Sequence, residues 1–122
     1  MADQRRNLPV LDCATEPLVR DPLTAEQAVS IAAVFKALSD PVRLRLLSLI
    51  ASHAGGEACV CDLTPSFEVS EPTISHHLKV LREAGLVTSE RRASWVYYRL
   101  VPGALAGLAH LLDTTEHAAA GR

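Results

Sequence analysis

The sequence predicts a mainly α-helical, α+β domain of the winged helix–turn–helix class, with a β-hairpin as the wing. A short apolar segment precedes a longer amphipathic one over 70–84, and two β-rich segments flank Ala93-Ser94. Helical patterns precede and follow this block. A chain of 122 residues is long enough for one such domain.

The first half of the chain predicts two successive helices. Thr24 is a suitable N-cap, and apolar residues recur at helical spacing through 24–38. Asp40 and Pro41 then start a second helix, because the first helical position tolerates the missing N–H of proline. The glycine pair at 55–56 predicts its end.

The second half predicts the helix–turn–helix and the wing. The segment CVCDLTPSF predicts a brief helix that stops at its proline. Ser70 is the expected N-cap of SEPTISHHLKVLREAG, with Pro72 in the first turn and Gly85 as the C-cap. LVTSERR and SWVYYRLV predict a hairpin, and Pro102 opens a last helix.

The ends of the chain show few signs of regular structure. Residues 1–22 hold three prolines and predict a flexible arm that carries Cys13, followed by a folded domain over 23–113 and a tail over 114–122. No apolar run reaches the roughly 18 residues of a membrane span, and the start does not resemble a secretory signal. We therefore expect a cytoplasmic protein without a membrane partner, in a compartment that keeps thiols reduced.

Charge is distributed unevenly along the chain. The net charge of −2 by itself argues against a nucleic-acid partner, because neutralising phosphates supplies most non-specific affinity. Residues 75–100, however, hold five basic and two acidic residues, a local net charge of +3. A basic segment on an otherwise acidic chain predicts a directed electric field.

The 70–84 segment has two distinct helical faces. Ile74, Leu78 and Leu81 fall within about 60° of one another and predict a buried stripe. The opposite face suits a DNA major groove, with hydroxyls for base edges and cations for phosphates. A merely solvated face would look the same in an isolated helix, but the short helix before it and the basic hairpin after it favour DNA. The predicted DNA-binding residues are Ser70, Thr73, Ser75, His76, Lys79, Arg82, Arg91 and Arg92.

Three smaller features bear on the same surface. His77 lies at the edge of the apolar stripe, where we expect a packed and hydrogen-bonded role. Arg91 and Arg92 lie at the hairpin tip, where a wing meets the DNA backbone or minor groove. The aromatic residues beside them could stack on single-stranded bases, but a hairpin on a small domain needs large apolar groups, so core packing is preferred. They are Trp95, Tyr97 and Tyr98.

Cys59 and Cys61 flank a single Val60. Residues two apart on an ideal helix point about 200° away from each other, so this pair can share one ion only if the backbone there is not helical. Two packed apolar thiols are the alternative interpretation. If both thiolates held one ion, the first turn of the brief helix would fray and bias the domain away from its DNA-binding arrangement.

The segments LSDPVRLRLLSLI, CVCDL, ISHHLKVLREAGLV and YYRL together resemble the ArsR/SmtB family of metal-responsive transcriptional repressors. The resemblance covers roughly residues 24–113. It implies a homodimer that binds double-stranded operator DNA and leaves it when an inducer binds. It also implies dimer contacts in the first and last helices, here about 24–38 and 102–113. Apolar residues of the last helix agree with this role, although an intramolecular core would look the same: Ala104, Leu105, Leu108, Leu111 and Leu112.

In that family CVCDL is typical of arsenic and cadmium sensors, which implies a thiophilic inducer at Cys59 and Cys61. Cys13 would complete a soft site of three thiolates, in its own or the partner chain. As(III) or Sb(III) bonds three sulfurs in a trigonal pyramid, whereas Zn(II) prefers four ligands and the chain has no fourth cysteine. Cd(II) or Pb(II) ranks second, because the similar sensors usually draw two cysteines from the arm; His53 or Asp12 could add a donor.

Three alternatives remain open. His110, Asp113 and His117 share one face of the last helix and could bind Zn(II), although their spacing differs from the Asp-x-His pattern of the family's zinc sensors. A redox-sensing regulator would form a disulfide or a persulfide, with Cys13 as a partner because cysteines two apart make a strained disulfide. A thiol enzyme or metallochaperone is disfavoured, since the chain has no phosphate loop and no nucleophile–base pair. We expect no enzymatic activity and no organic cofactor.

Overall fold

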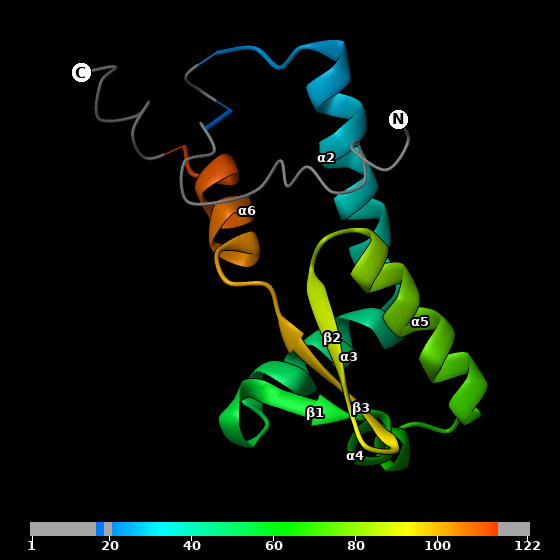
Figure 1. Cartoon of the computed structure of the whole chain (residues 1–122). Helices are drawn as coiled ribbons and strands as arrows, with labels where there is room; N and C mark the ends of the chain where they lie inside the picture. Colours follow the sequence, from blue (N-terminus) through cyan, green and yellow to red (C-terminus); the bar gives the residue numbers. More distant parts are fainter. Residues whose placement is uncertain (1–16, 19–20, 115–122) are drawn as a thin grey trace. The chain divides into compact units, whose positions relative to one another are not determined.

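The computed structural model describes residues 17–18 and 21–114 of the chain. The described residues fall into two units, one that includes 21–33 and 102–114 and the other from Val34–Val101 (Figure 1). Helix α2 (Ala25–Leu38) follows Thr24, as the sequence predicts, and runs from the first unit into the second. In the described part of the chain, no helix is long and apolar enough to cross a membrane. Cys13 lies outside the described residues.

Helix α3 (Pro41–Ser52) begins where the sequence predicts. The carboxylate of Asp40, its N-cap, accepts the backbone N–H groups of Val42 at 2.8 Å and Arg43 at 3.2 Å. Desolvation raises the pKa of Asp40, but these hydrogen bonds outweigh it and the pKa lies below its ordinary value. The start of α3 is therefore fixed by a local signal that the sequence carries.

The predicted end of α3 at the glycine pair is wrong by three residues. The helix ends at Ser52, and Gly55 and Gly56 lie beyond it in a 3₁₀ turn, Ala54–Gly56. Their φ values of 74° and 72° lie in the left-handed region that favours glycine. The pair therefore turns the chain into a strand instead of capping the helix.

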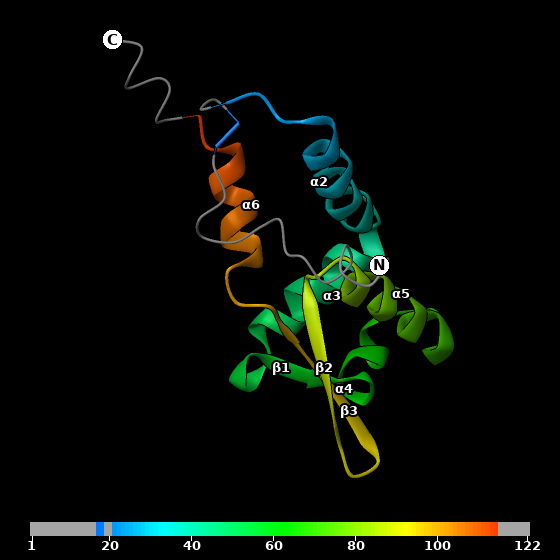
Figure 2. The same cartoon turned by 45° about the horizontal axis from the view of Figure 1, so that its top comes forward.

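That strand, β1 (Glu57–Cys59), was not predicted. It pairs antiparallel with β3 (Trp95–Leu100), which also pairs with β2 (Val87–Arg92), so that β1 lies at one edge of a three-stranded sheet. The β2–β3 hairpin turns at Ala93-Ser94, as predicted, and projects as a wing (Figure 2). Three residues are too few to show a period, which explains why the pattern missed β1.

The helix–turn–helix consists of α4 (Val60–Leu63), a 3₁₀ turn at Thr64–Ser66, and α5 (Glu71–Glu83). Helix α5 starts from Ser70 as predicted, but its C-cap is Ala84 and not Gly85. Gly85 follows at φ 82° and donates to the carbonyl of Arg82, while Leu86 donates to that of Leu81, both at 3.0 Å. This Schellman arrangement places the glycine one position beyond the cap.

The core of the Val34–Val101 unit joins the two helices of the motif to the sheet. Tyr98 is buried as predicted, whereas the prediction for Trp95 is wrong, because its side chain is 53% exposed beside the hairpin turn. The hairpin is longer than the core it covers, so its tip is left in solvent. Six core residues are fully buried: Leu46, Ile50, Ala58, Ile74, Leu78 and Leu81.

The other unit contains α6 (Ala104–Leu112), which begins two residues after the predicted Pro102. Its N-cap, Gly103, has a φ of 86°, so the chain turns there before the helix starts. The carbonyl of Leu111 accepts the N–H of Leu18 at 2.9 Å. One face of α6 is buried and another is exposed: Ala104, Gly107 and Leu111 on the first, Leu105 and Leu112 on the second.

Candidate thiol site and nucleic-acid interface

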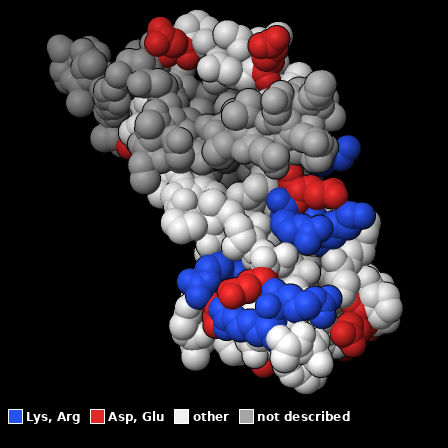
Figure 3. Space-filling model, in the orientation of Figure 1, with Lys and Arg blue, Asp and Glu red and all other residues white. Residues whose placement is uncertain are grey.

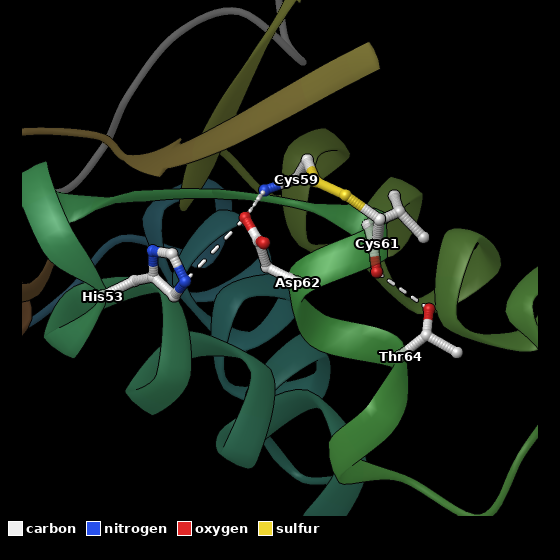
Figure 4. The surroundings of a disulfide bond; sticks show 6 residues. His53, Cys59, Cys61, Asp62 and Thr64 are labelled. Carbon is white, nitrogen blue, oxygen red and sulfur yellow. Dashed lines mark hydrogen bonds and ion pairs between the residues drawn. A yellow bond between two sulfur atoms is a disulfide. The ribbon is translucent and has the colours of Figure 1, made fainter.

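The two cysteines lie at the junction of β1 and α4. Cys59 ends β1 and is the N-cap of α4, with extended φ and ψ of −92° and 168°, whereas Cys61 lies in the first turn. Their Cα atoms are 5.3 Å apart and their sulfurs form a disulfide of 2.03 Å (Figure 4). The extended backbone at Cys59 meets the condition that the sequence set for two converging thiols.

The pairing of the sulfurs differs from the expected redox chemistry, which gave Cys13 as a partner. The spacing of two residues predicts a strained disulfide. Because Cys59 is extended, the two side chains meet across the helix start instead of pointing apart. Cys59 is buried and Cys61 is exposed, so reagents reach the pair from the side of Cys61.

Asp62 is the neighbour of the thiols that sequence reasoning missed. Its Oδ2 accepts the N–H of Cys59 at 3.0 Å, and the sulfur of Cys59 accepts the N–H of Asp62, which together form a capping box. One ligand atom each of Cys59, Cys61 and Asp62 lie within 4.8 Å of one another. No capping signature marks this contact in the sequence, because that motif has Ser or Thr followed three residues later by Glu or Gln, and here the two positions hold Cys59 and Asp62.

Other predicted ligands lie at different places. His53 Nε2 is 3.8 Å from Asp62 Oδ2, so it borders the thiol cluster (Figure 4). His110 and Asp113 lie at the end of α6, and the third member of that predicted zinc site, His117, lies outside the described residues, as does Asp12. Among the described residues, Cys59, Cys61 and Asp62 form the only group with the spacing of a metal site.

Helix α5 presents the predicted DNA-binding face to solvent. Ile74, Leu78 and Leu81 are fully buried, which confirms the apolar stripe. Ser70 Oγ accepts the N–H of Thr73 at 3.4 Å and lies 3.0 Å from its hydroxyl, so both hydroxyls order the first turn. The remaining predicted residues of this helix are exposed: Ser75, His76, Lys79 and Arg82.

His77 is hydrogen-bonded at the edge of the stripe, as the sequence predicts. Arg43 Nη1 lies 3.0 Å from His77 Nδ1, and Arg43 Nε donates to the carbonyl of Ala37 at 2.6 Å. Because a guanidinium only donates, Nδ1 of His77 is the acceptor of this hydrogen bond. One arginine of α3 thereby ties α5 to the end of α2.

The wing holds its two predicted arginines differently. Arg91 is exposed, and its side chain has no hydrogen bond or ion pair with any described residue. Arg92 donates to both carboxylate oxygens of Glu57 at 2.7 and 2.8 Å, and to Glu90 at 2.8 Å. Its guanidinium also lies 4.6 Å from the centre of the Tyr97 ring.

These contacts belong to a wider ion network on the sheet. Arg99 Nη2 also donates to Glu57 at 2.7 Å, so one carboxylate joins β1 to both strands of the hairpin. Hydrogen bonds from Arg92 and Arg99 lower the pKa of Glu57 to about 2, and Arg92 lowers that of Glu90. The same bonds raise the pKa of Arg92. Acidic side chains accordingly lie among basic ones over the sheet (Figure 3).

The fold and the site define a DNA-binding regulator of the winged helix–turn–helix class, with a thiol pair at the start of the helix that precedes the recognition helix. Residues 40–89 match the model of bacterial regulatory proteins of the arsR family. The chain is also 54% identical over 69 residues to the arsenic resistance transcriptional regulator ArsR1 of Pseudomonas putida; the match covers 57% of this chain and 52% of that one. The chain thus spans about half the length of this relative.

In two further comparisons the match covers a larger share of the other protein. The arsenic resistance transcriptional regulator ArsR2 of Pseudomonas putida is 45% identical over 85 residues, covering 70% of this chain and 72% of the relative. The crystal structure of the AntR antimony-specific transcriptional repressor superposes with a TM-score of 0.61 at 29% identity, covering 75% of this chain and 79% of that one. The chain belongs to the ArsR family of transcriptional regulators and is not an enzyme.

Proposed function

We propose that this regulator is a repressor that binds operator DNA as a homodimer and leaves it when As(III) or Sb(III) binds Cys59 and Cys61. Helix α5 would read the major groove and the wing would contact the backbone or minor groove, through the residues predicted above. The names of the arsenic- and antimony-responsive relatives support this class of inducer.

The observation that carries the proposal is the extended backbone of Cys59. It brings two sulfurs together at the start of α4, where a regular helix would separate them. In the reduced pair each thiol would replace one hydroxyl of arsenous acid, so that two As–S bonds form and two molecules of water leave. Cys13 would replace the third hydroxyl, from its own chain or from the partner.

Asp62 bears on the choice of ion. Its carboxylate lies in the same cluster as the two sulfurs. As(III) and Sb(III) favour a third sulfur, whereas Cd(II) and Pb(II) also accept oxygen. A site completed by Asp62 in place of Cys13 would therefore favour Cd(II) or Pb(II). The response of Cys13→Ser to each ion distinguishes the two ligand sets.

Apolar side chains on α2 and α6 support the proposed dimer. In α6, Leu105 is 37% and Leu112 48% exposed, and seven residues separate them, so they lie on one face. In α2, Val29 is 72% exposed. Large apolar groups left in water on two helices are typical of a surface that a second protein covers.

The disulfide supports a second candidate, a thiol redox sensor. Oxidation of Cys59 and Cys61 would occupy the same sulfurs as the metalloid, so the two states exclude each other. A redox sensor would release DNA on mild oxidation and rebind it after reduction by dithiothreitol. A metalloid sensor would release DNA under fully reducing conditions.

The test is fluorescence anisotropy of labelled upstream DNA with the reduced full chain. Arsenite, antimonite, Cd(II) and Zn(II) are titrated separately. Arsenite should weaken binding about 5- to 150-fold, the range typical of coupled sites. In Cys59→Ser/Cys61→Ser this response should vanish while DNA affinity stays, and Cys13→Ser should weaken it if Cys13 is the third ligand. Release by Zn(II) alone, unchanged in all cysteine variants, would refute the proposal.

A further inference from the structure

One carboxylate fixes the orientation of the wing. Glu57 accepts both terminal nitrogens of Arg92, and Glu90 accepts a further bond from Nη2. A bidentate pair holds the guanidinium in one plane as well as at one distance. Because Arg92 is the last residue of β2, this pair ties the tip of the hairpin to β1.

The strand that carries this carboxylate ends at the proposed inducer site. Glu57 is the first residue of β1 and Cys59 the last. Glu57 lies opposite Arg99, and Cys59 lies opposite Tyr97, whose ring is in contact with the guanidinium of Arg92. The thiol site is therefore connected to the wing twice: along β1 through Glu57, and across the sheet through Tyr97 of β3.

We propose that Glu57 is a positioning residue that couples inducer binding at Cys59 to the orientation of the wing. The inference rests on the proposed function. Arsenic bound to Cys59 and Cys61 would take the Cys59 sulfur from its hydrogen bond with the N–H of Asp62, and so loosen the residue that ends β1. Any displacement of β1 moves Glu57, and with it the clamp on Arg92.

Strand β1 is suited to such a displacement. It lies at the sheet edge, pairs with β3 alone and has three residues, so few ladder hydrogen bonds oppose its movement. The DNA contact that would change is that of Arg91, the neighbour of Arg92 at the tip. The side chain of Arg91 makes no hydrogen bond or ion pair within the described chain, so its guanidinium is available to a DNA phosphate.

The network is better suited to orientation than to stability. The side chains of Arg92 and Arg99 are 41% and 52% exposed, and exposed ion pairs contribute little to folding. Glu57 itself is 21% exposed and keeps its position through three hydrogen bonds. Removing its charge should leave a folded protein whose wing is no longer tied to β1.

The experiment measures the linkage between two ligands in the reduced full chain. The coupling factor is the Kd for labelled upstream DNA with saturating arsenite divided by the Kd without it. In Glu57→Gln it should fall from the wild-type value to about twofold or less, where typical coupled sites show 5- to 150-fold. Arsenite binding, followed by ultraviolet absorption of the As–S bonds, should keep its wild-type stoichiometry.

Glu90→Gln is the matched control. It removes the same charge from the same arginine, but Glu90 lies on β2 with Arg92, so their bond does not tie the wing to β1. Its coupling factor should stay at the wild-type value. Without arsenite, Glu90→Gln should bind DNA within about threefold of wild type, because it changes one screened charge. Glu57→Gln should already bind DNA more weakly than Glu90→Gln, because its wing is not tied to β1.

Arg92→Gln opens the same clamp from the wing and serves if Glu57→Gln does not fold. In the double variant Glu57→Gln/Arg92→Gln, the coupling factor should fall no further than in either single variant, because both substitutions remove the same contact. Wild-type release by arsenite with an unchanged coupling factor in both single variants would overturn this inference alone. A wild type that arsenite does not release would overturn the proposed function and this inference with it.

Discussion

The recognition helix and the wing both carry positive charge, but they hold it differently. The side chain of Lys79 on α5 has no hydrogen bond or ion pair among the described residues, and that of Arg82 makes a single 3.4 Å bond to Ser89. On the wing, Arg92 and Arg99 are paired with acids in one network. The helix thus offers free cations on a rigid base, whereas the wing has cations that set its own geometry.

This difference separates binding from control. A free cation on a helix that is anchored by a buried apolar stripe contributes to affinity whatever the state of the thiols. A paired arginine contributes only through the position of its neighbours, and that position depends on β1.

The largest effect should come from the base of the helix. Leu78 is fully buried on the apolar face of α5, so Leu78→Ala should lower the free energy of unfolding by about 2–5 kcal/mol. Urea denaturation of the reduced protein measures it. Leu44→Ala is the control, because Leu44 is 52% exposed and its change should stay within about 0.5 kcal/mol. Equal losses would mean that α5 is not anchored as described.

The second effect concerns the free and the paired cations directly. Lys79→Gln should weaken binding to all DNA sequences and reduce the slope of log affinity against log salt by about 1. Arg99→Gln removes the same charge, but Glu57 already neutralises Arg99, so the salt slope should change much less. Anisotropy titrations over a range of salt concentrations measure both. Equal slopes in the two variants would remove the distinction between helix and wing.

The smallest effect is expected from the ionisation of Glu57, which is measured by titration at acidic pH. The pKa of Glu57 is about 2 against an ordinary 4.5, because Arg92 and Arg99 favour its charged form. Because the pKa is lowered in the folded protein, the contribution of the ion network to the free energy of unfolding is complete above pH 4.5 and is lost as the pH falls towards 2. Carboxyl carbon shifts from NMR on the metal-free reduced protein should place the Glu57 midpoint near 2. A midpoint near 4.5 would mean that the network does not persist in solution.

Local signals account for most of the fold that the sequence predicted. Asp40 and Ser70 cap helices as expected, and the apolar stripe of α5 is buried. These features depend on a few neighbouring residues, which is why spacing alone predicted them. The wrong helix ends have the same origin, because a glycine shows that the chain turns but not on which residue it turns.

Long-range pairing accounts for what the sequence did not predict. Glu57 meets Arg92 and Arg99 only after β1 joins the sheet, and no local pattern indicates a three-residue strand. The contact of Asp62 with Cys59 is local, but cysteine is not a usual N-cap residue, so no capping pattern indicated it. The two halves of the candidate site thus differ in how far apart their residues lie in the chain.

The exposed indole of Trp95 has a practical consequence. It is the chain's single tryptophan, and it lies on β3 beside the hairpin turn. Tryptophan emission depends on solvent contact, so the intensity and wavelength of this fluorophore should respond when the wing meets DNA or changes its orientation. The protein carries a native optical reporter beside its hairpin turn, and neither ligand nor chain needs a label to follow it.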